Sequence, residues 1–231
     1  MAEEFKIRSL GPADHAQCVA LSADRGWQPA RRQWQLLLEQ AEVFGIDAPD
    51  GHGLAGSVVL GRYGAALASV GMMLVASRYG RRGLGRALLE HLLEETTAGT
   101  VYLTATTAGR PLYDKLGFRP IRASAQFTGE FVPEPGGRPV TRPAHGADRP
   151  AILDLDKAAF GADRGFLLRH LAGGFASQIR LDIDPDCPGL PGWAAAHGLS
   201  QAGQTTFMAR GPWPPSADRD RVFALISPAL G

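Results

Sequence analysis

The chain has 231 residues, a mass of 24.5 kDa and a formal net charge of +1, with 45% hydrophobic and 20% charged side chains. A chain this apolar can bury a core, and one this nearly neutral lacks the basic surface that binds nucleic acid. We therefore expect a soluble globular protein that does not bind nucleic acid and is long enough for one large domain or two small ones.

The sequence also argues against a membrane protein and against an oxidising compartment. An apolar stretch without charge, residues 63–77, has 15 residues and contains two glycines, so it is too short to span a bilayer. The N-terminus opens with acidic residues and lacks the pattern of a secretory signal. Cys18 and Cys187 are not spaced as metal ligands or as a disulfide framework. We expect a cytoplasmic protein, and 21 Arg against 3 Lys indicate a GC-rich, bacterial genome.

Within residues 1–131 the apolar spacing alternates between strand and helix periods. The predicted elements are a strand at 5–8, a helix from 11, a helix at 29–40, strands at 42–47, 54–60 and 65–76, a helix from 83, a strand at 101–103, a helix at 110–116 and a strand at 118–131. Ala16, Val19 and Ala20 form the predicted apolar face of the first helix. Gly61-Arg62-Tyr63-Gly64 fits a hairpin turn whose second strand is the longer. This order predicts an α/β (α+β) fold in which helices flank a mixed sheet that ends near residue 131.

The rest of the chain predicts a linker and a smaller unit. Residues 132–150 contain five prolines and the pair Gly136-Gly137, which is typical of a linker. Beyond it we predict helices at 151–159, at 166–171 and near Trp193, and strands at 178–183 and 205–209. The predicted organisation is a domain at 1–131, a linker at 132–150 and a C-terminal α/β unit at 151–231.

The clearest chemical signal lies between the long predicted strand at 65–76 and the amphipathic helix from residue 83. It reads Gly80-Arg81-Arg82-Gly83-Leu84-Gly85-Arg86, and together with Arg78 it places four arginines within nine residues that contain no acid. A helix N-terminus has unpaired N–H groups and the positive end of a dipole, and glycines let a phosphate approach the backbone. The segment is a candidate pyrophosphate site; the alternative is a capping turn whose arginines are only solvated.

Other nucleotide and metal motifs do not fit. A Walker loop needs Lys and then Ser or Thr after its last glycine, where this chain has Arg86-Ala87. A dinucleotide fold needs a third glycine where Leu88 stands, and a βαβ unit in place of a hairpin. The histidines are scattered, and the acidic run at 182–186 lacks the glycine and glutamate of a calcium loop. We therefore predict no metal site.

Three runs together resemble the GNAT superfamily of N-acetyltransferases, over residues 5 to about 130. They are Met72-Met73-Leu74-Val75, the segment at residues 80–86 (the glycine turn) continued to Leu89, and Leu112-Tyr113-Asp114-Lys115-Leu116-Gly117-Phe118. The resemblance implies a GNAT-like, mostly antiparallel sheet and acetyl-CoA as co-substrate, with no metal. It implies that backbone groups of Met73, Leu74 and Val75 bind the acetyl and pantetheine arm. It further implies a catalytic Tyr113 that protonates the leaving thiolate, and a pyrophosphate site formed by Arg81, Arg82, Gly83, Leu84, Gly85 and Arg86.

The chain departs from the family pattern at two positions. Gly80 stands where the pattern has Gln or Arg, and Arg81 takes the usual place of a glycine, so adjacent arginines would have to supply that phosphate contact. Thr106 stands where the family often has Asn, seven residues before the tyrosine. Its hydroxyl can still hydrogen-bond but reaches less far. We keep Thr106 among the expected cofactor-binding residues.

Acetyl transfer also needs a way to deprotonate the amine. An amine with a pKa near 10.4 is mostly protonated at pH 7, so presenting it as a nucleophile costs roughly 4.6 kcal/mol without a base. The strand before the turn offers only Ser69 and Ser77 as polar side chains. The base is therefore a water chain or a residue from elsewhere, with Glu42 and Asp24 as candidates. A backbone N–H near Leu74 or Val75 is expected to stabilise the charge that develops on the thioester oxygen.

The C-terminal unit more weakly resembles the second lobe of two-lobed GNAT proteins, through residues 159–164 and 206–211. Most of such a lobe is absent, so we expect a reduced GNAT-like lobe without a second cofactor site. We predict an N-acetyltransferase that moves the acetyl group of acetyl-CoA to a small-molecule amine by direct attack. The second unit would close the acceptor side or form a homodimer. The alternatives are a non-catalytic acyl-CoA sensor and an interaction module without a cofactor.

Overall fold

The computed structural model describes residues 5–27, 31–132, 142, 144–171, 178–213 and 224–225. Each predicted helix and strand is present, with ends shifted by a few residues. The helices are α1(His15–Asp24), α2(Arg31–Gln40), α3(Leu84–Glu95), α4(Arg110–Lys115), α5(Arg149–Phe160), α6(Gly165–Leu171) and α7(Leu190–Ala196). The strands are β1(Ile7–Leu10), β2(Glu42–Asp47), β3(Leu54–Tyr63), β4(Leu67–Val75), β5(Thr100–Ala105), β6(Arg119–Glu130), β7(Gln178–Ile183), β8(Leu199–Arg210) and β9(Ala224–Leu225). None of the helices in these ranges is long and apolar enough to cross a membrane.

One sheet connects all of these strands, in the order β1-β2-β3-β4-β5-β8-β6-β7-β9. Only β4 and β5 pair in parallel, so the expectation of a mixed, mostly antiparallel sheet is confirmed. Strand β8, from the C-terminal third of the chain, lies between β5 and β6. The expectation that the sheet ends near residue 131 is therefore wrong, because β8 supplies the hydrogen-bonding neighbour that β5 and β6 share. The division of the chain into two domains stays a prediction.

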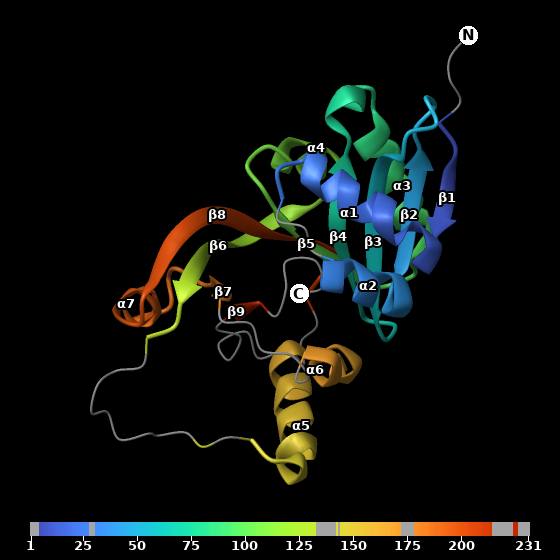
Figure 1. The fold of residues 1–231 in the computed structure, drawn as a ribbon. Coiled ribbons are helices and arrows are strands. Elements are labelled where there is room, and N and C mark those ends of the chain that lie inside the picture. Colours follow the sequence, from blue (N-terminus) through green and yellow to red (C-terminus); the bar gives the residue numbers. More distant parts are fainter. Residues whose placement is uncertain are drawn as a thin grey trace.

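Helices cover the sheet on both faces (Figure 1). Helices α1 and α2 lie in front of β2, β3 and β4, and α3 lies behind them. Strands β6 and β8 curve away from this body together, with α7 at their far end and α5 and α6 below. Helix α5 begins at Arg149, so the last residues of the predicted linker are helical; residues 133–141 and 143 of that linker lie outside the described residues.

The apolar interior forms three clusters along this layout. The main one lies between the sheet and helices α1 to α4. A second gathers Tyr63, Tyr102, Phe160 and Phe207 where α5 and α6 meet the sheet. The third is small and fills the space between the β6–β8 ribbon and α7. Burial in the second cluster explains why the hairpin turn lies later than predicted: β3 runs on to the buried Tyr63, which pairs with Leu67, and β3 is longer than β4.

Helix α1 buries a different face from the one predicted. Its buried residues are Cys18, Val19, Leu21 and Ser22, whereas Ala16 and Ala20 are exposed. The buried hydroxyl of Ser22 is satisfied, since it accepts a hydrogen bond from Trp34 Nε1 at 2.8 Å and donates to the Cys18 carbonyl at 3.3 Å. Burying the large Trp34 of α2 contributes more than burying an alanine methyl group, and the hydrogen bond orients α1 toward it.

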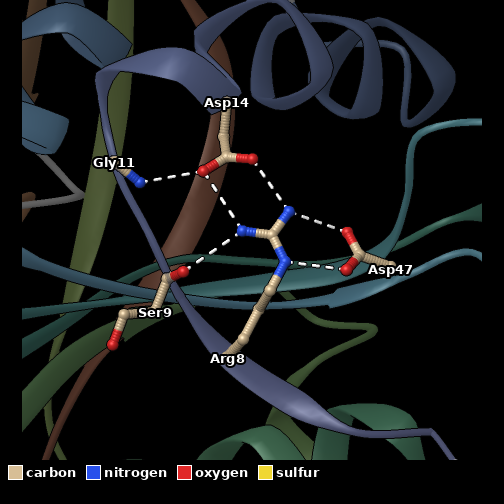
Figure 2. Close-up of polar contacts among 5 residues, drawn as sticks. All are labelled: Arg8, Ser9, Gly11, Asp14 and Asp47. Carbon is tan, nitrogen blue, oxygen red and sulfur yellow. Dashed lines mark hydrogen bonds and ion pairs between the residues drawn. The ribbon is translucent and has the colours of Figure 1, made fainter.

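An ion-pair network on Arg8 holds the start of α1 against the sheet (Figure 2). The Arg8 guanidinium donates to both carboxylate oxygens of Asp47 at 2.7 and 2.8 Å, and to those of Asp14 at 2.8 and 3.2 Å. Asp14 also accepts the Gly11 N–H at 2.9 Å. These hydrogen bonds, from Arg8 first, hold the pKa of Asp14 below its usual value. Arg8 thereby ties β1 and the end of β2 to the residue that precedes α1.

We predict that Asp14→Asn lowers the free energy of unfolding at pH 7 by about 1–2 kcal/mol, because Asp14 is 87% buried and bonded to a cation. A depressed pKa in the folded state stabilises the protein above pH 3.8, and this contribution is lost as the pH falls through the lower folded value. The matched control is Asp47→Asn, whose side chain is 57% exposed, with an expected loss below about 1 kcal/mol. Urea unfolding between pH 3 and pH 7 measures both; equal losses, or an Asp14 effect that persists at pH 3, would contradict this account.

Candidate functional site

Strands β4 and β5 part in the middle of the sheet. They pair only from Leu67 and Thr100 to Val70 and Leu103, after which β4 continues beside β3 alone. A β-bulge at Met72 marks the change, because the register with β3 shifts there and Met72 has a φ of 44°. A bulge twists a strand and releases backbone groups from the ladder. Met73, Leu74 and Val75 therefore follow the point at which β4 leaves β5.

The bulge is a conformation that a methionine rarely adopts, and the structure holds it in place. The buried hydroxyl of Ser57, on β3, donates to the Met72 carbonyl at 3.1 Å. A non-glycine residue in the left-handed region costs on the order of 1–3 kcal/mol and persists only where its surroundings impose it. Met72 and Leu74 are buried, while Met73 and Val75 remain half-buried. The strain is thus located where the candidate site needs backbone groups turned out of the sheet.

The glycine turn continues from β4 through a short 3₁₀ turn, Ser77–Tyr79, and ends at α3. Gly83 precedes the helix in the left-handed region, with a φ of 84° and nothing within 4 Å of where a Cβ would stand. No side chain caps the helix, and the first backbone bond into it runs from the Ala87 N–H to the Gly83 carbonyl at 3.0 Å. The N–H groups of Leu84, Gly85 and Arg86 therefore have no acceptor within the helix. This is a donor array at the positive end of a helix dipole.

The fold distributes the four arginines of this segment among different partners. Arg78 pairs with Asp50 at 3.0 Å, and Arg86 pairs with Glu90 at 2.8 Å. Arg82 lies over the ring of Tyr79 at 5.3 Å. Among the described residues, Arg81 has no ion pair or ring contact; it is exposed and has a φ of 65°. The absence of acids within the segment is thus offset by acids that lie elsewhere in the chain, and Arg81 and Arg82 are the cations best placed for an anion.

The start of the turn is held from several sides. Tyr79 is buried and packs edge-on against Phe5 at 5.9 Å. Asp50, in the β2–β3 loop, accepts the His52 N–H and interacts with Tyr79 and Arg78, and these hydrogen bonds lower the pKa of Asp50 to about 2. Asp50 therefore stays ionised, and its ion pair holds Arg78 against the β2–β3 loop. The segment before Gly80 is fixed, while Gly80 and Gly83 stay exposed.

Both carboxylates that were candidates for the base, Glu42 and Asp24, already have hydrogen-bond partners. Glu42 forms an ion pair with Arg62, which lowers the pKa of Glu42, and Arg62 also donates to the Glu95 carbonyl at 3.0 Å. Glu95 ends α3, so Glu42 lies roughly 16 Å from the N-terminus of that helix. Asp24 accepts the Ser77 N–H at 2.6 Å. Glu42 is therefore remote from the glycine turn, and Asp24 is engaged with the backbone that leads into it.

Helix α4 brings Tyr113 and Thr106 to the same end of the sheet. A Cβ placed on Gly85 would lie 3.5 Å from Leu112 Cδ2 and 3.6 Å from Val75 Cγ2, so α3, α4 and β4 converge there. A Cβ on Gly109 would lie 3.4 Å from the Thr106 hydroxyl and 3.6 Å from the Tyr113 hydroxyl. The two hydroxyls therefore flank one point. Burial raises the pKa of Tyr113 to about 12, and no described residue hydrogen-bonds its hydroxyl.

The predicted residues thus gather at one end of β4 and β5: the run after the bulge, the N-terminus of α3, and the pair Thr106 and Tyr113. Sequence reasoning missed Met72 and Ser57, which make the bulge, and no local signal marks them because methionine has no preference for a positive φ. It also missed Asp50, which engages Arg78. Across the described ranges no three His, Cys, Asp or Glu side chains are arranged to hold a metal ion.

Comparison with known proteins places this geometry in a family. Residues 40–120 match the acetyltransferase (GNAT) domain. YitH of Bacillus subtilis, an uncharacterised N-acetyltransferase, is 30% identical over 160 residues, which cover 66% of this chain and 55% of YitH. The aligned part thus spans about half the length of that relative.

Solved structures share the fold over nearly the whole chain. A protein of Pyrococcus horikoshii assigned as an acetyltransferase has a TM-score of 0.74 at 19% identity, covering 100% of this chain and 97% of its own. A GCN5-related N-acetyltransferase of Sphaerobacter thermophilus has a TM-score of 0.65 at 17% identity, covering 94% and 99%. At these identities the likeness concerns the fold. The matching residues contain the bulge, the glycine turn and Tyr113, so this part of the chain is an acetyltransferase domain of the GNAT superfamily.

Proposed function

We propose that the protein is an N-acetyltransferase that moves the acetyl group of acetyl-CoA to a small-molecule amine by direct attack of the amine on the thioester. One observation carries the proposal: the released end of β4, the uncapped N-terminus of α3 and the buried Tyr113 converge around Gly85 and Gly109. Acetyl-CoA would meet three features in turn: a donor array for its phosphates, a strand edge for its extended arm, and a hydroxyl for its leaving thiolate.

The residues at this site suit acetyl-CoA. The amides of residues 81–86 and the cations Arg81 and Arg82 would hold the pyrophosphate, because an uncapped helix start with open space at Gly83 can accept a bulky anion. Backbone groups of Met73, Leu74 and Val75 would bind the extended arm as an additional strand binds a sheet edge. Thr106 supplies a hydroxyl beside Tyr113 for the arm or the thioester.

The chemistry breaks the C–S bond of the thioester as the amine nitrogen forms a bond to the carbonyl carbon. A backbone N–H near Leu74 or Val75 would stabilise the charge on the carbonyl oxygen. Complete proton transfer from Tyr113, with a pKa of about 12, to a thiolate whose acid has a pKa near 8.5 would be uphill by roughly 5 kcal/mol. We therefore assign Tyr113 the role of a hydrogen-bond donor to the departing sulfur, which receives its proton afterwards from solvent.

The amine would approach from the face of the sheet opposite α3. A Cβ on Gly56 of β3 would meet Leu88, so this side of the strand faces α3. Side chains alternate between the two faces of a strand, and Tyr63 is seven residues after Gly56. The Tyr63 side chain therefore lies on the face opposite α3. There Tyr63 stacks on Phe166 of α6 at 6.1 Å. Tyr63 pairs with Leu67 at the start of β4, so α6 lies at the opposite end of the strand from the Met72 bulge. Helix α1 would border the approach of the amine, which favours a small acceptor.

Tyr113→Phe tests catalysis. A hydrogen bond to a charged group contributes about 1.5–3 kcal/mol, so we expect kcat to fall about 10- to 150-fold while the Kd for acetyl-CoA stays within about twofold. Release of coenzyme A with a panel of small amines measures the rate, and calorimetry measures the affinity. Because Tyr113 remains protonated to about pH 11, its loss should not alter the pH profile between pH 8 and pH 10. An unchanged rate in a protein that turns over would remove Tyr113 from the reaction, and binding without turnover would favour an acyl-CoA sensor.

Gly83→Ala tests the glycine turn. An alanine at a φ of 84° is strained by about 1–2 kcal/mol, so we expect acetyl-CoA to bind about 5- to 30-fold more weakly as the turn shifts. Gly80→Ala is the matched control, because Gly80 has a φ of −57° that alanine adopts without strain. Calorimetric titration with acetyl-CoA, and with ATP and NAD for selectivity, measures the effect. Failure of the unaltered protein to bind acetyl-CoA at millimolar concentration would refute the proposed function.

A further inference from the structure

Ser77 connects the two faces of the sheet at the end of β4. Its N–H donates to the Asp24 carboxylate at 2.6 Å, its hydroxyl donates to the Asp24 carbonyl at 3.3 Å, and the Arg25 guanidinium donates to that hydroxyl at 2.9 Å. Asp24 is the last residue of α1 and Arg25 follows it directly. The serine that leads into the glycine turn is thus bonded to the C-terminal end of α1 through both its backbone and its side chain.

These bonds join segments with different tasks in the proposed reaction. From Ser77 the chain passes to the glycine turn and to α3, on the face where the pyrophosphate would bind. Helix α1 covers the opposite face, where the amine would approach (Figure 1). After Arg25 the chain turns at Gly26, with a φ of 69°, and the Trp27 N–H bonds back to the Ser22 carbonyl at 3.0 Å. Trp27, which is 44% exposed, lies just beyond the end of α1.

Few packing contacts within the glycine turn hold residues 80–83 in place. Gly80 to Gly83 are exposed, two of these residues have a positive φ, and a Cβ at Gly83 would meet nothing within 4 Å. A bound anion that bridges the turn amides would restrict this segment and, through Ser77, its partners on α1. The other described anchors of the turn, Asp50 on Arg78 and Phe5 on Tyr79, lead to the β2–β3 loop and to the N-terminus. The Ser77 contacts are the ones that reach the acceptor side.

We propose that Asp24, Arg25 and Ser77 are positioning residues that couple occupancy of the glycine turn to the order of residues 21–27 at the acceptor side. This inference rests on the proposed function. It gives Asp24, a candidate base from sequence, a structural role toward the Ser77 amide. By linkage, breaking the contacts weakens the effect of acetyl-CoA on α1 and weakens acetyl-CoA binding by the same factor. Acetyl-CoA would then bind first and prepare the surface that the amine meets.

Hydrogen exchange of the full chain, with and without saturating acetyl-CoA, tests the coupling. In the unaltered protein we expect slower exchange in residues 80–90 and, about fivefold, in residues 21–27, which is the effect of roughly one net hydrogen bond. Ser77→Ala keeps the backbone bond to Asp24, and Asp24→Ala keeps the bonds of the Ser77 hydroxyl, so in each variant the protection of 80–90 persists while that of 21–27 falls. Ser77→Thr, which keeps the hydroxyl, restores it. Ser200→Ala is the matched control, because that exposed hydroxyl donates to the Thr128 carbonyl on the distant β6–β8 ribbon.

The outcomes separate this inference from the proposed function. Protection of 80–90 without protection of 21–27 in the unaltered protein overturns the coupling and leaves the acetyl-CoA site intact. Equal protection of 21–27 in the unaltered protein, Ser77→Ala and Asp24→Ala overturns it as well. Absence of any protection by acetyl-CoA in the unaltered protein overturns both. A variant that fails to fold is recognised by fast exchange throughout the chain. If either Ser77→Ala or Asp24→Ala fails in this way, the other variant tests the coupling.

Discussion

The site depends on the point at which strand β4 stops pairing with β5. A strand in the middle of a sheet is held on both sides, and its backbone groups are consumed by the ladder. Beyond Val70 this strand loses one neighbour, and the Met72 bulge, secured by the Ser57 hydroxyl, directs it away from β5. That separation leads to the turn into α3 and to the meeting of α3, α4 and β4 at Gly85. It would also let acetyl-CoA and the amine approach from opposite faces of the sheet.

Charge at this site is set by ion pairs as well as by the composition of the glycine turn. Asp50 and Glu90 engage two of the arginines around the glycine turn and leave Arg81 and Arg82 nearest to the uncapped helix start. Elsewhere the Arg8 network fixes the entry to α1, and the Ser77 contacts fix its end. Helix α1 is thus held at both ends by charged or polar contacts, and its middle is held by the buried bond between Trp34 and Ser22. A helix held in this way can transmit order from one face of the sheet to the other.

The C-terminal third completes the sheet. Strand β8 pairs with the edge of β5 opposite β4, and the aromatic cluster around Tyr102 holds α5 and α6 against the same strands. Those helices lie on the face of the sheet opposite α3. The single sheet therefore depends on residues far apart in the chain.

The sequence by itself determined the element order, the glycine turn and the family resemblance, because apolar periodicity and glycine placement are local signals that act within a few residues. It identified Met73, Leu74, Val75, Thr106 and Tyr113 through motif likeness. Only the tertiary structure decided the bulge at Met72, the insertion of β8, the buried face of α1 and the partner of Arg78. Each of these depends on contacts between residues far apart in the chain, where the gain from burying Trp34 or Tyr63, or from pairing a charge, outweighs local preference.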